Sequence, residues 1–548
     1  MSSTRSLLPG RAGWRTLLAA ALLVTCTLPQ VAAAAPDPLE VAETLRRSVE
    51  QLRSTGEVTV AGRKLHSVIA LPEVYETRGF QLLWTDAANQ EGLLGEIAVV
   101  GGEGLDPADY HFEAIRAALD RRSQEPASAA AAATADLLMT DALLRLAAHF
   151  HFGKLDPATG QPRWDLAGTI RGESGAALAQ RIASGRAVAS QLGELRPVQP
   201  MYGRLKSALA RYRLIEEQGG WEPLPAGRTL QLDTEDARVP LLRRRLAVSG
   251  DFLGVVVDSR RFEPALDEAV RRFQARNGLA VDGVFGPASL QVLNRPLEER
   301  LDQIRANLER ARWLLSEVRG HFLLVDPAGE RVALMDNSQP VHVQPAAFAA
   351  NSRDVPEFRA QMRYLVVNPD WVLPPRLVQT QVAPLARRAP AELQARGLQV
   401  FNSAGEAVDA ARADWSRPAT LIVRQVPGPR SFLGQLRFSM PNEAQVFLHG
   451  RPVEGEALPG SVSLEDSAAL ARALAAPATP PLSAGMAGIA AALAENQTRT
   501  LPLGTPIPVL FAPWTSWVET DGTVYFRAGF EDRDAAIIEG LRQRAGKP

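Results

Sequence analysis

Apolar residues recur at helical spacing through most of the first half of the chain. Val41 to Leu52 forms an amphipathic pattern, and Ala135 to Phe152 carries apolar residues throughout, which predicts a well-buried helix. Met201 to Glu217 predicts another helix with one apolar face. The alanine run from Ala127 to Ala133 fits either the start of a helix or a flexible connector. Together these patterns predict a mostly helical domain.

Residues 237–295 show the helical spacing again, in three short segments separated by turns. The apolar residues at this spacing are Leu242, Leu246, Leu266, Val270, Phe273, Leu290 and Leu293. Asn277-Gly278 stops the second segment, and Gly286-Pro287 makes a turn before the third. The pattern predicts a compact three-helix unit.

From residue 321 the helical spacing gives way to short apolar runs between Pro, Gly and Asn residues. The runs are Phe322 to Val325, Tyr364 to Val367, Thr420 to Val423 and Gln445 to Leu448. Such runs predict β-strands in a curved sheet or barrel. A loop is predicted over Pro477 to Ser483, followed by a short helix over Gly485 to Glu495. The fold class is therefore predicted as multidomain α+β.

The length and charge of the chain add limits to this picture. With 548 residues it is long enough for about three to four domains. The changes of pattern divide it into a leader of residues 1–34 and domains over residues 35–236, 237–296 and 300–548. The formal net charge is -1, which gives no reason to expect nucleic-acid binding, since that needs a strong basic excess.

The first 34 residues have the pattern of a secretory signal peptide. Arginines precede a short apolar run from Leu17 to Thr25, and small residues follow up to Ala34. We expect cleavage after Ala34 and export to the periplasm or cell envelope. The alternatives are an uncleaved anchor and a lipoprotein signal ending at Cys26. No later segment is long and apolar enough to predict a transmembrane helix.

Cys26 is the only cysteine of the chain. Once the leader is removed, the protein has no disulfide, no cysteine metal ligand and no thiolate nucleophile. This absence decides which chemistry the remaining residues can perform.

A long string of spaced residues characterises the three-helix unit. From Ala269 to Leu293 it contains Ala-Val, Phe-Gln, Gly-Leu, Val-Asp-Gly and a closing Leu, each at a fixed interval. This string resembles the signature of the peptidoglycan-binding domain, a small three-helix module. The resemblance implies that residues 237–296 bind peptidoglycan; the alternative is a helical bundle without a ligand.

Further short motifs, each different from the others, occur in the rest of the chain. In the strand-rich region they are Asn307, Arg312-Trp313-Leu314, Met362 to Pro369, Trp371, Pro374-Pro375, Arg424 to Pro429, Leu433-Gly434, Phe438, Pro441-Asn442, Val446 to His449, Pro506 to Val509, Thr515, Trp517-Val518 and Asp521 to Arg527. In the first half they are Tyr75, Arg78, Trp84, Gly104 to Pro107, Tyr110-His111, Thr140-Asp141 and Gly153 to Pro157. With these motifs the chain resembles the L,D-transpeptidase (YkuD-like) family, in particular the large murein transpeptidases with a helical scaffold, a peptidoglycan-binding domain and a β-rich catalytic domain.

The resemblance implies a cysteine thiolate that attacks a tetrapeptide stem, and an amine of a neighbouring stem that resolves the acyl-enzyme into a crosslink. The implied motif contains a histidine, a glycine and the cysteine in succession, with an arginine shortly after. In this chain Gly460 is retained, but Pro459 stands at the histidine position, Ser461 at the cysteine position and Ser463 at the arginine position. Three residues that the chemistry needs are replaced together.

Ser461 could replace the thiol only with help from a base. An alcohol is much harder to deprotonate than a cysteine of pKa about 8.5. Pro459 removes the base of the motif, so the nearest histidine in sequence is His449, with Glu456 and Glu465 as nearby acids. We therefore expect a catalytically impaired family member that binds peptidoglycan. The alternative is an active acyltransferase that crosslinks stems with Ser461 as nucleophile and His449 as base.

Other chemistry receives little support from the sequence. His149 and His151 lie two positions apart on a helix and point to different faces, so no metal site is predicted, and no cofactor motif is evident. Core positions are expected for Trp313, Trp371, Trp415, Trp514 and Trp517. The expected partners are peptidoglycan and other cell-wall enzymes that the protein would regulate or position. A structural protein without wall affinity is a third alternative.

Overall fold

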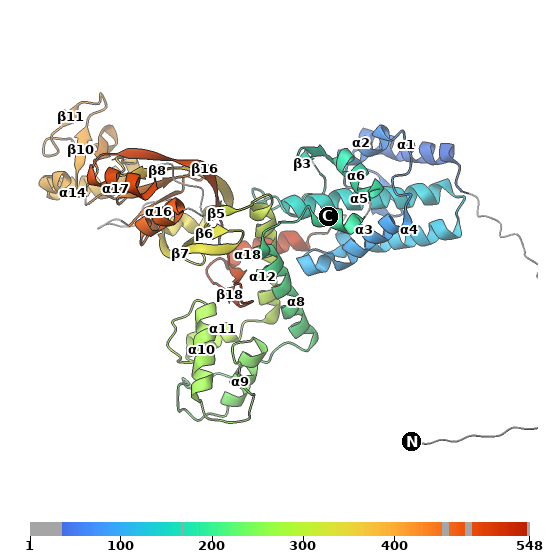
Figure 1. The fold of residues 1–548 in the computed structure, drawn as a ribbon, viewed down its shortest axis with the longest axis horizontal. Coiled ribbons are helices and arrows are strands. Elements are labelled where there is room, and N and C mark those ends of the chain that lie inside the picture. The colour runs from blue at the N-terminus through green and yellow to red at the C-terminus, as the bar shows by residue number, and fades with distance from the viewer. Residues whose placement is uncertain are drawn as a thin grey trace, which may run out of the picture.

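The computed structural model describes residues 35–166, 168–185, 187–428, 430–451, 460–476 and 485–544. The predicted leader, Pro459, Glu456 and the predicted loop at 477–483 lie outside these residues. Figure 1 shows a helical region, a β-barrel with an inserted subdomain, and a small three-helix unit. This arrangement confirms the multidomain α+β fold class. Every helix within the described ranges is too short or too polar to cross a membrane.

Helices α1 to α8 make up the helical region. Their bounds are α1 (Pro38–Thr55), α2 (Ala70–Thr77), α3 (Ala87–Val99), α4 (Phe112–Gln124), α5 (Ala129–Phe152), α6 (Gly175–Ser184), α7 (Val188–Gly193) and α8 (Pro200–Glu217). The Ser128 side chain caps α5 by accepting a hydrogen bond from the Ala131 amide, so the alanine run is a helix start and not a connector. Almost all of α5 is buried, because the surrounding helices contribute to one core around it.

Helices α9 (Val239–Val248), α10 (Pro264–Arg276) and α11 (Pro287–Leu293) form the small unit at the bottom of Figure 1. The predicted apolar residues share its core, with Leu290 partly buried against it. Gln274 fixes the turn after α10: its Oε1 accepts from the Asp282 and Gly283 amides, and its Nε2 donates to Asp282 Oδ1 at 2.8 Å. The Gln and the Asp-Gly pair of the sequence signature therefore stabilise the shape of this unit.

Helix α12 (Leu297–Leu315) connects the three-helix unit to the rest of the molecule. It packs against α5, α8 and α18 (Glu531–Arg542), and most of its residues are buried. On α12, the fully buried Arg312 donates to Glu309 Oε2 at 2.6 Å and to the Glu103 carbonyl and the Tyr202 hydroxyl, both at 3.0 Å. Hydrogen bonds of a buried arginine thus join α12 to the helical region.

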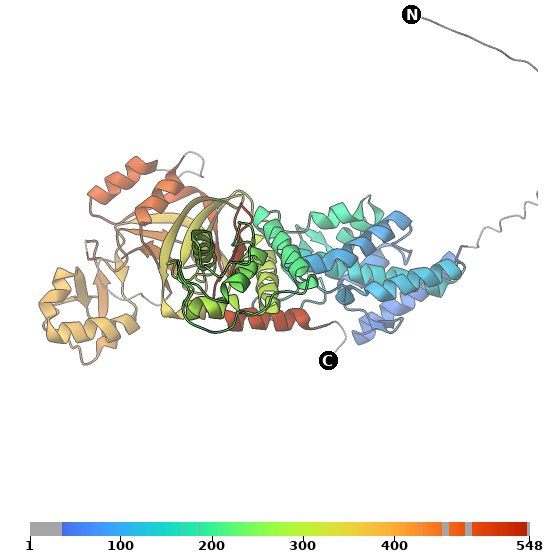
Figure 2. The ribbon, with the colours of Figure 1, turned by 90° about the horizontal axis from the view of Figure 1, so that it is seen from below.

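Helix α18 returns to the helical region after the barrel is complete, and Figures 1 and 2 both show it between the two. It follows the small hairpin of β17 (Ser516–Val518) and β18 (Val524–Phe526). Its residues Ile537, Ile538 and Leu541 join the same core as α5. The buried Lys154 ammonium, just after α5, donates to the carbonyls of Leu541 and Gln543 at 2.8 and 2.7 Å. The core of the helical region is therefore built from residues at both ends of the described chain.

Eight strands close into the barrel. They are β5 (His321–Asp326), β6 (Arg331–Asp336), β7 (Gln339–Phe348), β8 (Phe358–Val367), β13 (Leu436–Ser439), β14 (Phe447–Gly450), β15 (Ser461–Leu464) and β16 (Arg499–Phe511). The order around the barrel is β13-β14-β15-β7-β6-β5-β16-β8, and pairing of β8 with β13 closes it. Helices α16 (Ser467–Ala475) and α17 (Gly485–Ala494) contribute apolar residues to its core.

Two strands begin later than the sequence predicts. Gln445 has a left-handed φ of 55°, which a strand does not accommodate, and β14 begins at Phe447. Thr420 ends a short 3-10 turn, and the strand β12 (Ile422–Gln425) begins after it. The predicted runs at Phe322 to Val325 and Tyr364 to Val367 lie within β5 and β8.

A subdomain over residues 371–433 is inserted between β8 and β13; the structure describes all of these residues except Pro429. Its strands β9 (Trp371–Val372), β10 (Leu398–Phe401), β11 (Ala407–Val408) and β12 form a sheet of order β11-β10-β12-β9. Its short helices are α13 (Pro375–Leu377), α14 (Ala383–Arg388) and α15 (Pro390–Ala395). It has a core of its own and lies at the end of the molecule away from the helical region.

Candidate functional site

The strands β14 and β15 carry the residues that the sequence singles out. They are parallel neighbours, with Leu448 opposite Val462 and His449 opposite Ser463. Leu448, Val462 and Leu464 belong to the barrel core. Because side chains alternate along a strand, His449 and Ser463 point to the outer face of the barrel, together with Phe447 and Ser461.

Ser461, at the position of the implied cysteine, is fully buried in this face. Its strand partner is Phe447, and its hydroxyl has no hydrogen-bond partner among the residues that the structure describes. Gly460 precedes it with a left-handed φ of 77°, and a Cβ there would come within 2.7 Å of the Gln445 carbonyl oxygen. This close approach explains the need for glycine at that position. Neither Gly460 nor Gln445 offers Ser461 a side-chain base.

His449 is also buried, with 1% of its surface exposed. Its Nδ1–H donates to the Gly450 carbonyl at 2.6 Å, and the ring stacks on Phe447 with centroids 5.4 Å apart. Burial lowers the pKa of His449 to about 4, although the carbonyls of Gly450 and Leu433 act in the opposite direction. The imidazole is therefore neutral near pH 7. In the described part of the chain, Nε2 has no hydrogen bond.

The strand register brings His449 together with Ser463, at the implied arginine position, and not with Ser461. No hydrogen bond joins the histidine to either hydroxyl within the described ranges. Positions within the motif predict only a pair of His449 and Ser461, because the register of β14 against β15 cannot be assigned from a single segment.

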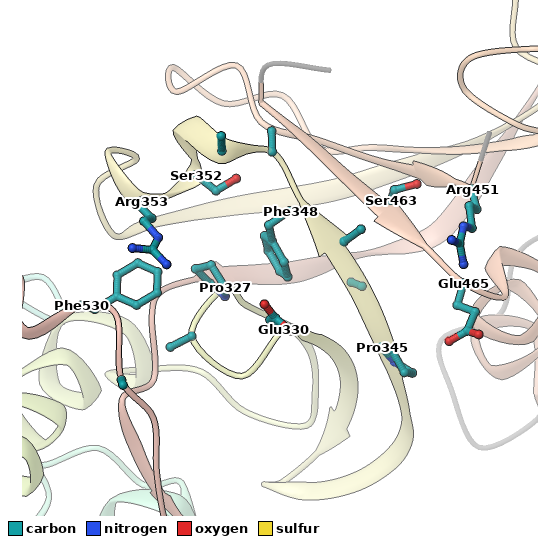
Figure 3. A pocket seen from close by; sticks show the side chains of 16 residues that line it. Pro327, Glu330, Pro345, Phe348, Ser352, Arg353, Arg451, Ser463, Glu465 and Phe530 are labelled. Carbon is teal, nitrogen blue, oxygen red and sulfur yellow. The ribbon is translucent and has the colours of Figure 1, made fainter. Parts of the chain in front are cut away.

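An open cavity of about 810 Å³ lies beside this face, and Figure 3 shows its walls. Its charged and hydroxyl-bearing side chains include Ser463, Arg451 and Glu465 near one end and Arg353 at the other, beside the ring of Phe530. Neither Ser461 nor His449 lines it. Of the hydroxyls at the motif positions, Ser463 is the one that meets this space.

The inserted subdomain covers the outer face of β14. Trp371 contacts both Phe432 and Phe447, with ring centroids 6.4 Å apart in each case. Phe447 packs against the core of the subdomain, and Gly434 lies so close to Gly450 that a Cβ on it would be 3.0 Å from the Gly450 carbonyl. Aromatic packing therefore shields His449 and Ser461 from solvent.

The other candidate residues occupy structural positions. His149 is buried and hydrogen-bonds the Tyr110 hydroxyl at 2.8 Å and the Arg163 carbonyl at 2.5 Å, while His151 contacts the Ser316 hydroxyl. Over the described ranges no group of three or more His, Cys, Asp or Glu residues is arranged to hold a metal ion. Buried positions are found for Trp415, Trp514 and Trp517, and partly buried ones for Trp313 and Trp371.

Sequence reasoning missed Arg437 on β13, directly opposite His449. A signal for it was present: a single arginine between Leu436 and Phe438 at strand spacing must leave the barrel core. Without the order of the strands, nothing connected it to His449.

Three family models match successive parts of the chain. Residues 69–209 match a scaffold domain, residues 235–293 a peptidoglycan binding domain and residues 320–507 an L,D-transpeptidase catalytic domain. A candidate L,D-transpeptidase of Haemophilus influenzae is 30% identical over 186 residues, which are 32% of this chain and 37% of that protein. The chain therefore matches little more than a third of the length of this relative.

Two solved structures are also similar to the chain in part. An L,D-transpeptidase of Xylanimonas cellulosilytica is 15% identical with a TM-score of 0.15, and covers 53% of this chain and 100% of its own. A fused zinc-dependent amidase, peptidase and peptidoglycan-binding protein of Clostridium acetobutylicum is 12% identical with a TM-score of 0.14, at 52% and 100% coverage.

Proposed function

Since this chain is a member of the L,D-transpeptidase family, we propose that it binds peptidoglycan in the cell envelope without crosslinking it. It thereby regulates or positions other cell-wall enzymes. The match of residues 235–293 to a peptidoglycan binding domain supports the binding half of this proposal. The arrangement around Ser461 supports the other half.

The observation that carries the proposal is the environment of the nucleophile position. Ser461 has a hydroxyl in place of a thiol, is fully buried and has Phe447 as its strand neighbour. A serine nucleophile needs a base within hydrogen-bond reach, and no described residue bonds this hydroxyl. The neutral His449, whose pKa burial lowers to about 4, is also a poor proton acceptor near pH 7.

The second candidate function is acyl transfer by Ser461 with His449. Both residues lie on the same outer face, which favours this alternative over a nucleophile elsewhere in the barrel. The register and the missing hydrogen bond argue against it.

Pelleting with purified sacculi tests the binding half. We expect the protein without its first 34 residues to sediment with sacculi, and a variant that also lacks residues 237–296 to remain in the supernatant. A cooperative melting transition of the β-barrel in that variant is the control for folding. If the two proteins sediment equally, the three-helix unit is not the wall-binding module, and if neither does, the structural alternative is favoured.

Mass spectrometry after exposure to a carbapenem tests the catalytic half. We expect no covalent adduct, and no crosslinked product from tetrapeptide stems. An adduct on the peptide that contains Ser461, absent in Ser461→Ala, would overturn the proposal in favour of acyl transfer.

Two single-cysteine variants sharpen this test, because the chain after the leader has no other thiol. Ser463→Cys borders the open cavity, and Ser461→Cys lies under the aromatic cover. We expect a small thiol reagent to label position 463 at least tenfold faster than position 461. Equal rates would show that the nucleophile position is accessible.

A further inference from the structure

A small cavity of about 250 Å³ lies where the helical region meets the barrel. Its walls come from the end of α5 and the segment that follows it, from the end of α12, and from β8. The side chains that line it include His151, Arg163, Ser316, Glu317 and Arg359. None of its lining residues borders the larger cavity beside β15, so the two cavities are separate.

Arg163 reaches the cavity from the helical region, in the segment after α5. Its amide donates to the Lys154 carbonyl at 2.6 Å, and its own carbonyl accepts a hydrogen bond from His149, so its backbone is fixed on both sides. Its Nη2 donates to Asp156 Oδ2 at 3.0 Å. Its Nε is buried and has no hydrogen bond within the described ranges. Arg163 therefore keeps an unused donor in the wall of the cavity.

Arg359 reaches the same cavity from the barrel. On β8 it is paired with Leu510 of β16, which belongs to the core shared with α12, so the arginine lies on the outer face of the barrel. Its Nη2 donates to the Ser316 carbonyl at 2.8 Å, and no carboxylate in the described part of the chain forms an ion pair with it. The side chain is exposed, so a ligand can reach its remaining donors.

Glu317 is the negative side chain of the lining. Its carboxylate lies 3.6 Å from His151 Nε2 and 3.9 Å from Arg171 Nε, and half of the side chain is exposed. Burial lowers the pKa of His151, so this imidazole is neutral near pH 7. Glu317 thus balances Arg171, and Asp156 balances Arg163, while the positive charge of Arg359 is left over.

We propose that this cavity binds a phosphate group, free or as a small monoester, between Arg163 and Arg359. A phosphate has several acceptor oxygens and carries close to two negative charges above its second pKa of about 6. It can therefore accept hydrogen bonds from two guanidinium groups that arrive from different elements, whereas the fork of a single arginine fills one carboxylate. The cavity is also smaller than the roughly 300 Å³ at which pockets for drug-sized ligands begin, which favours a small ligand.

Calorimetric titration with inorganic phosphate tests the site in the chain without its first 34 residues. We expect saturable binding, which Arg163→Gln and Arg359→Gln should each weaken about tenfold. Arg363→Gln is the matched control, because it removes an exposed arginine further along β8, and it should leave the affinity unchanged. Glu317→Gln should tighten binding about threefold, because it removes a negative charge from the wall.

Glycerol 3-phosphate distinguishes the two sources of the group. If it binds at least as tightly as inorganic phosphate, the cavity takes a monoester, and if it binds more weakly, the cavity takes free phosphate. Unchanged affinity in both arginine variants would overturn the proposal, because the phosphate would then be an adventitious ion elsewhere on the chain. Tighter binding of acetate than of phosphate, or no saturable binding of either phosphate compound, would overturn it as well.

Thermal melting gives a second measurement, because a phosphate between the two arginines joins the helical region to the barrel. Phosphate should raise the melting temperature of the unaltered chain and of Arg363→Gln, but not that of Arg163→Gln or Arg359→Gln. Melts without phosphate show whether the variants fold, and Glu317→Gln moves the affinity in the opposite direction if an arginine variant is unstable. These measurements involve neither Ser461 nor residues 237–296, so their outcome is independent of the proposed function.

Discussion

Two buried polar clusters of this protein differ in how their groups are satisfied. Around α12, Arg312 and Lys154 are buried, and each makes several hydrogen bonds to carboxylates, carbonyls or hydroxyls. On the outer face of β14 and β15, His449 Nε2 and the hydroxyls of Ser461 and Ser463 have no hydrogen bond within the described ranges. The first cluster serves the structure, because its partners are built into the fold.

Under the proposed function, the difference separates a structural site from a face at which reaction has been lost. A cluster that only stabilises the fold loses free energy for each unpaired group and is therefore completed by its neighbours. The β14–β15 face is buried under an aromatic cover and contains Gly460, and it has serines at the positions to which the resemblance assigns a cysteine and an arginine. The two clusters should therefore respond differently to the same kind of substitution.

The largest effect is expected from removing a partnered buried arginine. Arg312→Leu leaves the Glu309 carboxylate in the core without its ion pair, and should lower the free energy of unfolding by about 3–5 kcal/mol. Arg437→Leu leaves no described carboxylate unpaired, and should change it by less than about 1 kcal/mol. Urea denaturation measures both. Similar losses in the two variants would contradict the comparison.

Acid sensitivity is the next expected effect. The folded-state pKa of His449 is about 4, below its ordinary 6.5, so the unfolded chain binds a proton more readily. Stability should therefore fall as the pH decreases from 6.5 to 4, by at most about 3 kcal/mol from this residue. In His449→Gln that part of the pH dependence should disappear, as melting temperatures between pH 7 and 4.5 would measure. His66, with a pKa also near 4, keeps its own contribution in the variant.

A smaller effect is expected at the retained glycine of the motif. Gly460→Ala puts an alanine into a left-handed backbone and brings its Cβ within 2.7 Å of the Gln445 carbonyl oxygen. The substitution should lower the free energy of unfolding by about 2 kcal/mol. Gly485→Ala is the matched control, since it has a φ of 57° but nothing within 4 Å of the new Cβ. It should cost about 1 kcal/mol. Equal losses in urea denaturation would mean that the contact with Gln445 relaxes freely.

The smallest effect is expected at Ser461. Its hydroxyl has no partner in the described chain, so Ser461→Ala should be neutral or stabilising within about 1 kcal/mol. Thr515→Val provides the contrast, because the Thr515 hydroxyl donates to Asp534 Oδ2 and accepts from Asn307 Nδ2, both at 2.7 Å. That variant should lose about 1–3 kcal/mol. A comparable loss in Ser461→Ala would reveal a hidden partner of the serine.

Much of the fold was predictable because its signals are local. The core helix α5 and the three short helices around Phe273 follow from apolar spacing within single segments. The closed order of the barrel and the return of α18 to the helical region could not be predicted, because they join residues far apart in sequence. Strand starts at β12 and β14 were missed by two residues each for local reasons, a 3-10 turn and a left-handed Gln445.

The candidate site was predictable in its residues and not in its pairing. The positions of Gly460, Ser461 and Ser463 follow from the order of the motif. Their partners depend on the parallel register of β14 and β15, which a shift of two residues would change, and on Arg437 from a strand that no motif marks. Register is fixed by the packing of the whole barrel core, and a single segment does not contain that information.

The hydrogen bonds of Lys154 set an order of events for protein synthesis. Its ammonium is neutralised by Asp109 nearby, but its other acceptors, the carbonyls of Leu541 and Gln543, are made 387 and 389 residues later. A nascent chain that has finished the helical region still exposes the apolar side that Ile537, Ile538 and Leu541 will cover. The helical region, which is synthesised before the barrel, therefore completes its core only after the last helix of the barrel domain has been made.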